Sequence, residues 1–498
     1  MPLVSEKGAL RAGSGARVNS RRSDREHNNR DSHASAVNLS FRHVEVPLST
    51  LASSVPPGPK ARFPGDMILR MTRERLELLR HMASTFGDIS ALSLGKQRIV
   101  LLTNPEDIRD VLVTNQRMFR KGQALERAKV LIGEGLLTSE GETHLRQRRL
   151  VQPAFHRARI GAYAGAMTGA AMTRQDKWKD GEFLDANRAM MIITLDIVAS
   201  TLFGADVGSE SSEIGSALDD VFEAFTIGYG PLTPLLDLIP TPKKRRFTAG
   251  MKRVDATIGR IIAKRRASGE DTGDLLSMLL HATDTEGDGT GMSDQQLRDE
   301  AITLFIAGHE TTANALTWTW LLLARNPDAE RALHDEVDQV VGDRLPTLDD
   351  LPQLAMTRAI VAESMRLYPP AYIVGRRAVE PYSVGGFDFP ARTIFLCPQF
   401  LVHRDPRWWP EPDRFIPQRW LDAAATAARP KLAYFPFGAG TRICVGEQFA
   451  WMEAMLVLAT LARRWRVRVQ GPDPALEPII TLRPKDGLPS RLERRRNH

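Results

Sequence analysis

One of the chain's two cysteines, Cys444, lies in a glycine-rich loop at residues 435–446. The loop leads directly into a helical pattern at residues 447–465. A thiolate at this point would lie at a helix N-terminus, where backbone N–H groups and the helix dipole favour negative charge. The alternative is a structural cysteine in a strand-to-helix turn, because free cysteines are commonly buried as small apolar side chains.

The residues around Cys444 suit a flat ligand with anionic groups on its rim. Glycines let the backbone approach such a ligand closely and adopt positive φ angles. The loop contains three of them, Gly438, Gly440 and Gly446. Phe437 can pack against the ligand, and Arg442 can bind an anion on its rim. Together these features indicate a haem-thiolate site.

The full spacing, Phe437-x-x-Gly440-x-Arg442-x-Cys444-x-Gly446, resembles the haem-binding motif of the cytochrome P450 superfamily at every position. The resemblance extends over about residues 55–490. It implies a mainly α fold with a smaller β-rich portion, in which a long central helix lies over the haem and the cysteine loop lies beneath it. It also implies haem b as the cofactor and Cys444 as the axial ligand of its iron.

A second candidate site lies in the longest helical pattern, which begins after Ser293, a suitable N-cap, and runs to about residue 325. Within it, Glu310 and Thr311 place an acid beside an alcohol in an apolar run. Gly308 and the threonines can loosen the helix locally, because hydroxyl groups compete for backbone carbonyls. The alternative is a threonine that bonds its own helix beside a solvated glutamate. The string resembles the oxygen-activation motif of the family, which implies that Glu310 and Thr311 deliver protons.

Two charged residues one turn apart, Glu363 and Arg366, are typical of a surface ion pair. They also resemble the family's Glu-x-x-Arg pair. The resemblance implies that Arg419 completes a buried network with them, which supports the core beneath the haem and has no catalytic role. Gln418 stands where many members carry glutamate, but this position lies outside the network.

Haem carries two propionates that need cationic partners. The resemblance assigns this role to His144 and Arg148, one helical turn apart, together with Arg376 and Arg442. Many family members have tryptophan at the position of His144. Arg377 lies beside Arg376 and can exchange roles with it. Each of these residues taken singly is equally typical of a solvated surface.

The resemblance also indicates which segments contact the substrate. They include residues 222–236, which precede a predicted helix at 244–268. The individual candidates are mainly aliphatic or aromatic, and each is equally suited to a packed core: Leu304, Phe305, Ala307, Tyr372, Ile373, Val374 and Ile480. They favour a hydrophobic substrate such as a terpenoid, steroid, fatty acid or macrolide-like molecule.

Charge and composition describe one large body with polar ends. The net charge of +7 arises mostly in residues 1–46 and 488–498, which each contribute +3. The nearly neutral remainder indicates neither nucleic-acid binding nor a polybasic membrane face. No run reaches the ~20 apolar residues that span a bilayer. We therefore expect a disordered extension at 1–46, a single haem domain at 47–490, a basic tail at 491–498, and a monomeric cytoplasmic protein.

The chain has no glycine-rich strand–turn–helix unit for a flavin or nicotinamide. Electrons are therefore expected from a separate ferredoxin with its reductase, or from a flavin reductase. Arg146, Arg149 and Lys431 are candidates for attracting an acidic partner. The predicted activity is oxygenation of a bound apolar molecule by dioxygen. A peroxide-driven peroxygenase and a non-catalytic haem sensor or electron carrier are the alternatives.

Overall fold

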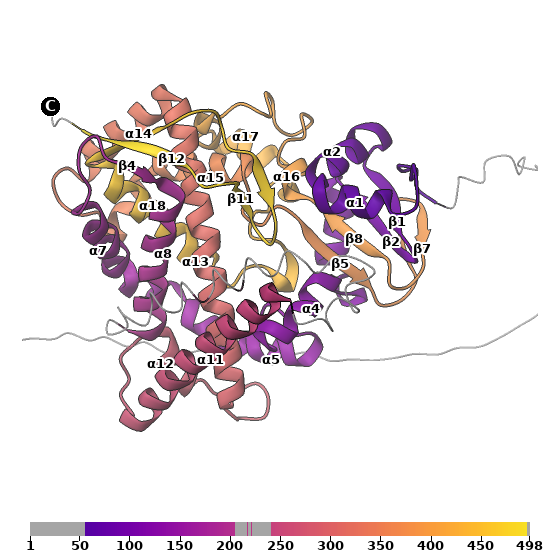
Figure 1. The fold of residues 1–498 in the computed structure, drawn as a ribbon, viewed down its shortest axis with the longest axis horizontal. Coiled ribbons are helices and arrows are strands. Elements are labelled where there is room, and N and C mark those ends of the chain that lie inside the picture. The colour runs from indigo at the N-terminus through magenta and orange to yellow at the C-terminus, as the bar shows by residue number, and fades with distance from the viewer. Residues whose placement is uncertain (1–54, 205–216, 218–220, 222–240, 496–498) are drawn as a thin grey trace, which may run out of the picture. The chain divides into compact units, whose positions relative to one another are not determined.

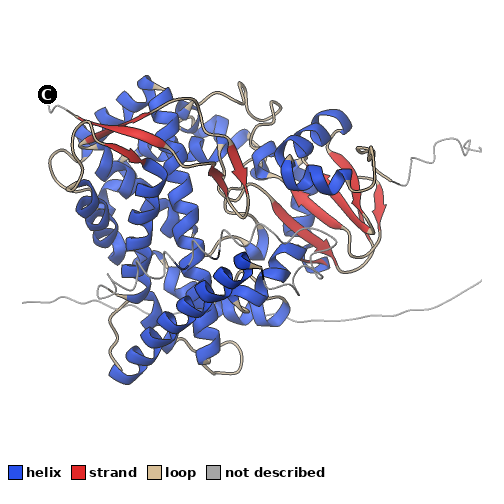
Figure 2. Cartoon of the chain, in the orientation of Figure 1, coloured by secondary structure: helices blue, strands red, loops and turns tan. Residues whose placement is uncertain are grey.

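The computed structural model describes residues 55–204, 217, 221 and 241–495. The described part is mostly helical with a smaller strand-rich portion (Figure 2), which confirms the predicted fold class. The predicted extension at residues 1–46 and the substrate-contacting residues 222–236 lie outside the described residues. The last strand, β12 (Pro489–Arg494), continues past residue 490.

The long central helix, α13 (Asp294–Arg325), contains 32 residues, which gives a length of about 48 Å. Its N-terminus is fixed by a capping box: the Ser293 hydroxyl accepts from the Gln296 N–H at 3.2 Å, and the Gln296 side chain accepts from the Ser293 N–H at 3.1 Å. The predicted N-cap is thus confirmed. The helix ends at the residue before Asn326-Pro327, where proline disfavours helical backbone in the preceding residue.

Other long helices pack around α13 (Figure 1). They are α8 (Ala186–Phe203), α11 (Pro242–Ser268), α15 (Ala355–Leu367) and α18 (Glu447–Ala462). The contact between α8 and α13 is close at Gly308, where a Cβ atom would lie 2.7 Å from the Val198 side chain. A glycine is needed at this position because any larger side chain would separate the two helices.

The other α-helices of the described residues lie around this core or beside the main sheet (Figure 1). They are α1 (Asp66–Arg73), α2 (Arg75–Phe86), α3 (Pro105–Arg109), α4 (Gln123–Ile132), α5 (Gly141–Val151), α6 (Arg157–Ile160), α7 (Ala164–Gln175), α12 (Leu275–His281), α14 (Pro327–Val340), α16 (Gln399–Val402) and α17 (Ala423–Ala428).

The main sheet has five strands in the order β1-β2-β8-β5-β3. Their bounds are β1 (Ile89–Leu94), β2 (Gln97–Leu102), β3 (Phe119–Lys121), β5 (Val374–Ala378) and β8 (Ile394–Cys397). Only the β2–β8 pair is parallel, and the other three pairs are antiparallel. The β3–β5 register places Lys121 opposite Arg376. This pairing brings two cations from distant parts of the chain to one edge of the sheet.

Three small antiparallel sheets complete the strands. One has the order β4-β12-β9, with β4 (Phe183–Asp185) and β9 (Trp465–Val469) on either side of β12. Another is the hairpin of β6 (Tyr382–Val384) and β7 (Phe387–Phe389). The third is the hairpin of β10 (Leu476–Pro478) and β11 (Leu482–Pro484), whose turn lies against α13.

The glycines at positions 122, 133 and 135 make residues 116–141 typical of a long irregular loop in sequence, but this segment contains β3 and α4. The glycines that suggested a loop mark the ends of α4: Gly122 is its N-cap, and Gly133 follows it with a φ of 71°. The helix between them consists largely of good helix formers such as alanine, leucine, glutamate and arginine. Glycine at both boundaries therefore delimits a short helix here.

A buried ion network joins α15 to the segment before the cysteine loop. Glu363 and Arg366 have no solvent exposure and form two hydrogen bonds, of 2.8 and 2.9 Å. Arg419 donates to Glu363 at 3.0 Å, and the Trp420 indole N–H donates to it at 2.8 Å. The predicted triad therefore has the expected geometry, and Trp420 is an additional member.

One described helix, α8, is long and apolar enough by length and composition to cross a membrane. More than half of its apolar window is buried in the protein, and it packs along α13 and α7. These contacts are those of a core helix.

We predict that Glu363→Ala destabilises the protein by about 3–5 kcal/mol, because it leaves the buried Arg366 guanidinium without a carboxylate. Glu77→Ala is the matched control, since Glu77 pairs with Arg80 on the surface with both side chains at least half exposed. An exposed pair of this kind contributes about 0–1 kcal/mol. Urea unfolding measures both changes, and equal losses in the two variants would contradict a structural role for Glu363.

Candidate functional site

The cysteine loop is built on two glycines with left-handed backbone. Gly438 and Gly440 have φ angles of 76° and 70°. A Cβ atom at Gly440 would lie 2.1 Å from the Leu112 carbonyl oxygen, so this position has no room for a side chain. Gly446 has a φ of −88° and is the N-cap of α18. The expected positive φ is therefore found at two of the three glycines.

Cys444 is presented at the start of α18, as the loop sequence predicts. Its backbone N–H donates to the Phe437 carbonyl at 2.9 Å, which closes the loop, while Phe437 packs near Trp451. The cysteine has accessible surface, although protein surrounds the loop. The protein around the loop desolvates the Cys444 thiol and raises its pKa to about 11, while the backbone N–H of Gly446 opposes this shift. The thiol has room for a ligand but lies in a poorly solvated place.

The second cysteine has a different environment. Cys397 lies on β8 with no solvent exposure, within an apolar cluster of the main sheet. Burial raises the pKa of its thiol to about 12. Cys397 is therefore a packing residue, and Cys444 is the cysteine that is open to a ligand.

Two of the predicted cations, Arg148 on α5 and Arg442 in the cysteine loop, join that loop to α5 and to the residues before it. Arg148 on α5 donates to the Ile443 carbonyl at 2.7 Å. Arg442 donates to the Ser139 carbonyl at 3.0 Å and pairs with Glu140 at 2.5 Å. Arg148 therefore contacts the backbone beside Cys444, whereas Arg442 ties the cysteine loop to the residues before α5, and both guanidiniums are partly buried.

The structure distinguishes the two adjacent arginines of β5. Arg376 is buried and donates to the Gly375 carbonyl at 3.0 Å. Arg377 is on the opposite face of the strand and pairs with Glu126 on α4. Arg376 is therefore the member of the pair that joins the buried cations.

Lys121 is a further buried cation that the sequence reasoning missed. It is 5% exposed, and its Nζ donates to the carbonyls of Leu136 at 2.8 Å and Ser139 at 2.9 Å. Burial, followed by the charge of Arg442, lowers its pKa to about 7. The alternation along β3 was the available signal, because Lys121 shares a face with the buried Phe119.

The buried cations create a positive field around His144. His144 is 2% exposed, and burial lowers the pKa of its imidazole to about 3, with the charges of Arg442 and Lys121 as the next causes. The ring is therefore neutral at pH 7. Arg148 and Arg376 act in the same direction on His144. A ligand with two carboxylates fits this region because its charges would compensate those of the surrounding cations.

One short face of α13 remains accessible although most of the helix is buried. Ala307 is exposed, and Leu304, Gly308 and Thr311 are half-buried. These residues lie on one face by their spacing of three and four. The Thr311 hydroxyl donates to the Ala307 carbonyl at 2.6 Å, and the helix is continuous through this turn. The expected local loosening of the helix is therefore not seen.

Glu310 points away from this accessible face. It is 5% exposed, and its Oε1 accepts from the Thr481 hydroxyl at 2.7 Å. Its neighbour His309 is buried against α8 and lies 3.0 Å from the Met191 carbonyl. Burial lowers the pKa of His309 to about 4, so its ring is neutral. The acid and the alcohol are adjacent in sequence but lie in different environments.

The candidate substrate residues divide into two groups. Leu304, Ile373 and Val374 are half-buried, Ala307 is exposed, and Ile480 is 41% exposed. Phe305 and Tyr372 are packed in the core: Phe305 is stacked on Phe203 at 6.0 Å between ring centroids, and the Tyr372 hydroxyl donates to the Ile479 carbonyl at 3.0 Å.

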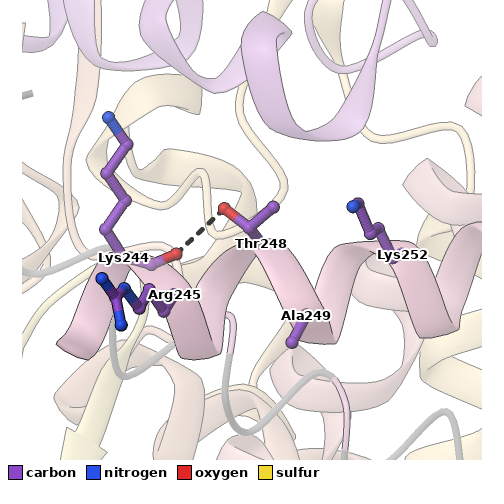
Figure 3. Close-up of a pocket in the computed structure, with 5 residues that line it drawn as sticks. All are labelled: Lys244, Arg245, Thr248, Ala249 and Lys252. Carbon is purple, nitrogen blue, oxygen red and sulfur yellow. Dashed lines mark hydrogen bonds between the residues drawn. The ribbon is translucent and has the colours of Figure 1, made fainter. Parts of the chain in front are cut away.

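Two surface hollows lie outside this group of residues. One, of about 330 Å³, lies on the exposed face of α11 and is lined by cations and small side chains (Figure 3): Lys244, Arg245, Thr248, Ala249 and Lys252. The other, of about 610 Å³, lies between α5 and the loop before α13. None of the predicted catalytic or cofactor-binding residues lines either hollow.

Two of the three basic residues proposed to attract a redox partner, Arg146 and Arg149, are engaged within the chain. Arg149 forms a bidentate pair with Asp284, at 2.8 and 2.7 Å. Arg146 donates to the Thr290 hydroxyl at 2.8 Å and lies 3.7 Å from Asp284. Both therefore fasten the loop before α13 to α5. Lys431 is exposed.

Comparison with known proteins identifies the relatives of this fold and site. The family model described as cytochrome P450 matches residues 56–488. Cyclooctatin synthase from Streptomyces melanosporofaciens is 41% identical over 403 residues, which cover 80% of this chain and 87% of the relative. Cyclooctat-9-en-7-ol 5-monooxygenase from the same organism is 35% identical, with 85% and 93% covered. Pentalenene oxygenase from Streptomyces avermitilis is 35% identical, with 82% and 90% covered.

We predict that Gly440→Ala reduces both stability and cofactor retention. The substitution imposes a side chain at positive φ, which costs about 1–3 kcal/mol, and its Cβ would also collide with the Leu112 carbonyl. Gly169→Ala in α7 is the control, because its Cβ would meet no atom within 4 Å and alanine favours a helix interior by about 1 kcal/mol. Urea unfolding and the ratio of cofactor to protein after purification measure the effect. Unchanged values for Gly440→Ala would contradict the steric argument.

Proposed function

The chain belongs to the cytochrome P450 family and is a haem-thiolate monooxygenase, and we propose that its substrate is a terpenoid with a largely hydrocarbon skeleton. As a member of this family it binds haem b and inserts one oxygen atom from O2 into a hydrophobic substrate. The electrons come from a redox partner. The chemistry of dioxygen activation is supplied by the haem when it is bound.

The proposed axial ligand is Cys444. Its support is the accessible sulfur at the start of α18, in a loop whose backbone is fixed by Gly440 and by the hydrogen bond from Cys444 to Phe437. The N-terminus of α18 and the Gly446 N–H favour the thiolate over the thiol. A bound iron would hold this sulfur as the thiolate and so offset the burial that raises the pKa of the Cys444 thiol, because a metal-bound thiol is deprotonated.

We assign the haem carboxylates to the buried cations between α5, β3, β5 and the cysteine loop. Arg148, Arg376 and Arg442 supply fixed positive charge, and Lys121 adds a cation that the family resemblance did not indicate. His144 is neutral in its present environment and can donate one N–H to a carboxylate. Phe437 and Gly446 belong to the loop that would lie beneath the ring. The electropositive surroundings of His144 are the observation that supports this assignment.

Glu310 and Thr311 are proposed to supply protons during oxygen activation. The Thr311 hydroxyl lies on the accessible face of α13 and, while it donates to the Ala307 carbonyl, its oxygen can accept a proton or a hydrogen bond. Glu310 is held on the neighbouring side of the helix. Delivery from the acid to Thr311 therefore requires a water molecule to bridge the two groups, because the bond from Thr481 holds the carboxyl group in place. A peroxide-driven enzyme would not need this pair.

The terpenoid assignment combines two observations. Two of the relatives are named for oxygenation of cyclooctat-9-en-7-ol and pentalenene, which are terpenoids. In this chain, the candidate pocket residues that retain exposure are all aliphatic: Leu304, Ala307, Ile373, Val374 and Ile480. An aliphatic lining suits a carbocyclic skeleton and offers no ionic partner for a carboxylate.

We further propose a monomeric cytoplasmic enzyme that receives electrons from a separate ferredoxin or flavin reductase.

The haem ligand is tested by the absorption spectrum of the reduced, carbon monoxide-bound protein. We predict the strongly red-shifted Soret band of a thiolate-ligated haem in the parent enzyme. Cys444→Ala should abolish this band, because it removes the sulfur that binds iron. Cys397→Ala is the control and should retain it, since Cys397 is packed in the sheet. A histidine-type spectrum in the parent, or the same spectrum in Cys444→Ala, would refute the assignment.

The substrate class is tested by titrating the oxidised enzyme with pentalenene, cyclooctat-9-en-7-ol and, for comparison, a long-chain fatty acid. We predict that at least one terpenoid produces a saturable change in the haem spectrum at lower concentration than the fatty acid, because the pocket is aliphatic. Ala307→Phe should weaken the response, since a large side chain would fill the accessible face of α13. Tighter binding of the fatty acid than of either terpenoid would refute the proposed class.

A further inference from the structure

The turn between β10 and β11 is bonded directly to the proposed proton-delivery acid. The Thr481 hydroxyl donates to Oε1 of Glu310 at 2.7 Å, and both side chains are 5% exposed. The two residues are 171 positions apart in sequence. A short hydrogen bond to a carboxyl group in a poorly solvated place constrains its orientation strongly.

A second side chain fixes the direction of this hydrogen bond. Asn314 lies one turn after Glu310 on α13 and donates its amide N–H to the Thr481 oxygen at 3.0 Å. Its own oxygen accepts from Asn187 on α8 at 3.4 Å, and Asn187 also donates to Thr317 at 3.2 Å. A threonine hydroxyl has one proton. Because Asn314 occupies the hydroxyl oxygen as a donor, that proton is directed to Glu310.

The hairpin that presents Thr481 is anchored by three hydrogen bonds. The Trp318 indole N–H donates to the Leu482 carbonyl at 2.9 Å, and the Leu482 N–H donates to the Pro370 carbonyl at 2.9 Å. The Tyr372 hydroxyl donates to the Ile479 carbonyl at 3.0 Å. These bonds flank position 481, so the backbone that carries the hydroxyl is held against α13.

The hydrogen-bonded series of side chains Asn187, Asn314 and Thr481 can orient the Glu310 carboxyl group but is poorly suited to conducting protons to it. An asparagine amide donates through its nitrogen and accepts through its oxygen, so passing a proton along it requires a change of tautomer. The proton of Glu310 must therefore come by another route, and this series can only set where the carboxyl group points.

From this arrangement we propose that Thr481 is a positioning residue that orients the carboxyl group of Glu310 for proton delivery, with Asn314 as its support. The proposal rests on the role of Glu310 given under the proposed function. It does not depend on the identity of the organic substrate. It goes beyond the acid–alcohol pair because it places a determinant of proton delivery on a hairpin far away in sequence.

The orientation is tested by infrared difference spectroscopy of the substrate-free holoenzyme. Thr481→Val removes the hydroxyl but keeps the shape of the side chain, and Thr481→Ser keeps the hydroxyl. We expect Thr481→Val to shift a carboxyl stretching band that is unchanged in Thr481→Ser and absent when Glu310 is replaced by Gln. Thr319→Val is the control, because the buried Thr319 hydroxyl donates to the Ala315 carbonyl of its own helix.

The functional consequence is measured as dioxygen consumption per haem without organic substrate, driven by a plant-type [2Fe–2S] ferredoxin and its reductase. We expect the rate to fall about tenfold in Thr481→Val, the scale on which the loss of one buried hydrogen bond acts. Thr481→Ser and Thr319→Val should stay within about twofold of the parent. In the Glu310→Gln background, Thr481→Val should have no further effect.

Several outcomes would overturn the proposal. These are an unchanged carboxyl band in Thr481→Val, equal rates in Thr481→Val and Thr481→Ser, or a further loss in the Glu310→Gln background. If the band shifts but Glu310→Gln consumes dioxygen at the parental rate, the proposed role of Glu310 fails and Thr481 has a structural role only. If Thr481→Val does not fold, Asn314→Asp replaces it: loss of the amide donor should move the same band and lower the rate, and no change would refute the proposal.

Discussion

The central constraint on this molecule is that α13 must be buried along its length and still keep one short face open. A 32-residue helix at the centre of the fold is stabilised by removing its apolar side chains from water on nearly every side. The close contact with α8 at Gly308 belongs to this packing. The exception is the turn around Ala307, where small side chains leave accessible surface. The neighbouring acid, Glu310, is buried and bonded to the β10–β11 hairpin.

Buried charges are compensated differently in the Glu363 network and in the group of cations near the cysteine loop. Glu363 and its partners compensate one another by direct ion pairing, which makes that network a fixed support. The cations near the cysteine loop are instead held largely by backbone carbonyls, as Lys121 and Arg148 illustrate. Carbonyl oxygens fix a cation in place without cancelling its charge. Positive charge is therefore retained for an anionic ligand. After burial, the charge of Arg442 is the next cause of the lowered pKa values of Lys121 and His144.

The β10–β11 turn combines two roles that are usually assigned to separate elements. Thr481 faces inward and bonds the acid on α13, while its neighbour Ile480 is 41% exposed. One turn therefore carries both a polar contact to Glu310 and an apolar surface.

The basic residues of α5 suggest a docking surface by their charge, but their contacts lie within the chain. Arg146 and Arg149 contact Thr290 and Asp284, and these contacts hold the loop before α13.

The sequence by itself determined the helical class of the fold, the capping of α13 and the local geometry of the cysteine loop. These features are determined locally, because capping, glycine conformation and helix periodicity involve residues close together in the chain. It also singled out the Glu363 network, although only through the resemblance to a family. Only the tertiary structure decided between Arg376 and Arg377, since strand pairing determines which of two neighbours faces inward.

Three further features were not predicted from the sequence: the burial of Lys121, the engagement of Arg146 and Arg149, and the bond from Thr481 to Glu310. Each depends on contacts between segments that are far apart along the chain. A charged or hydroxyl side chain looks the same in sequence whether it is solvated or buried. Its environment is set by the neighbours that folding brings to it, and those neighbours determine its chemistry.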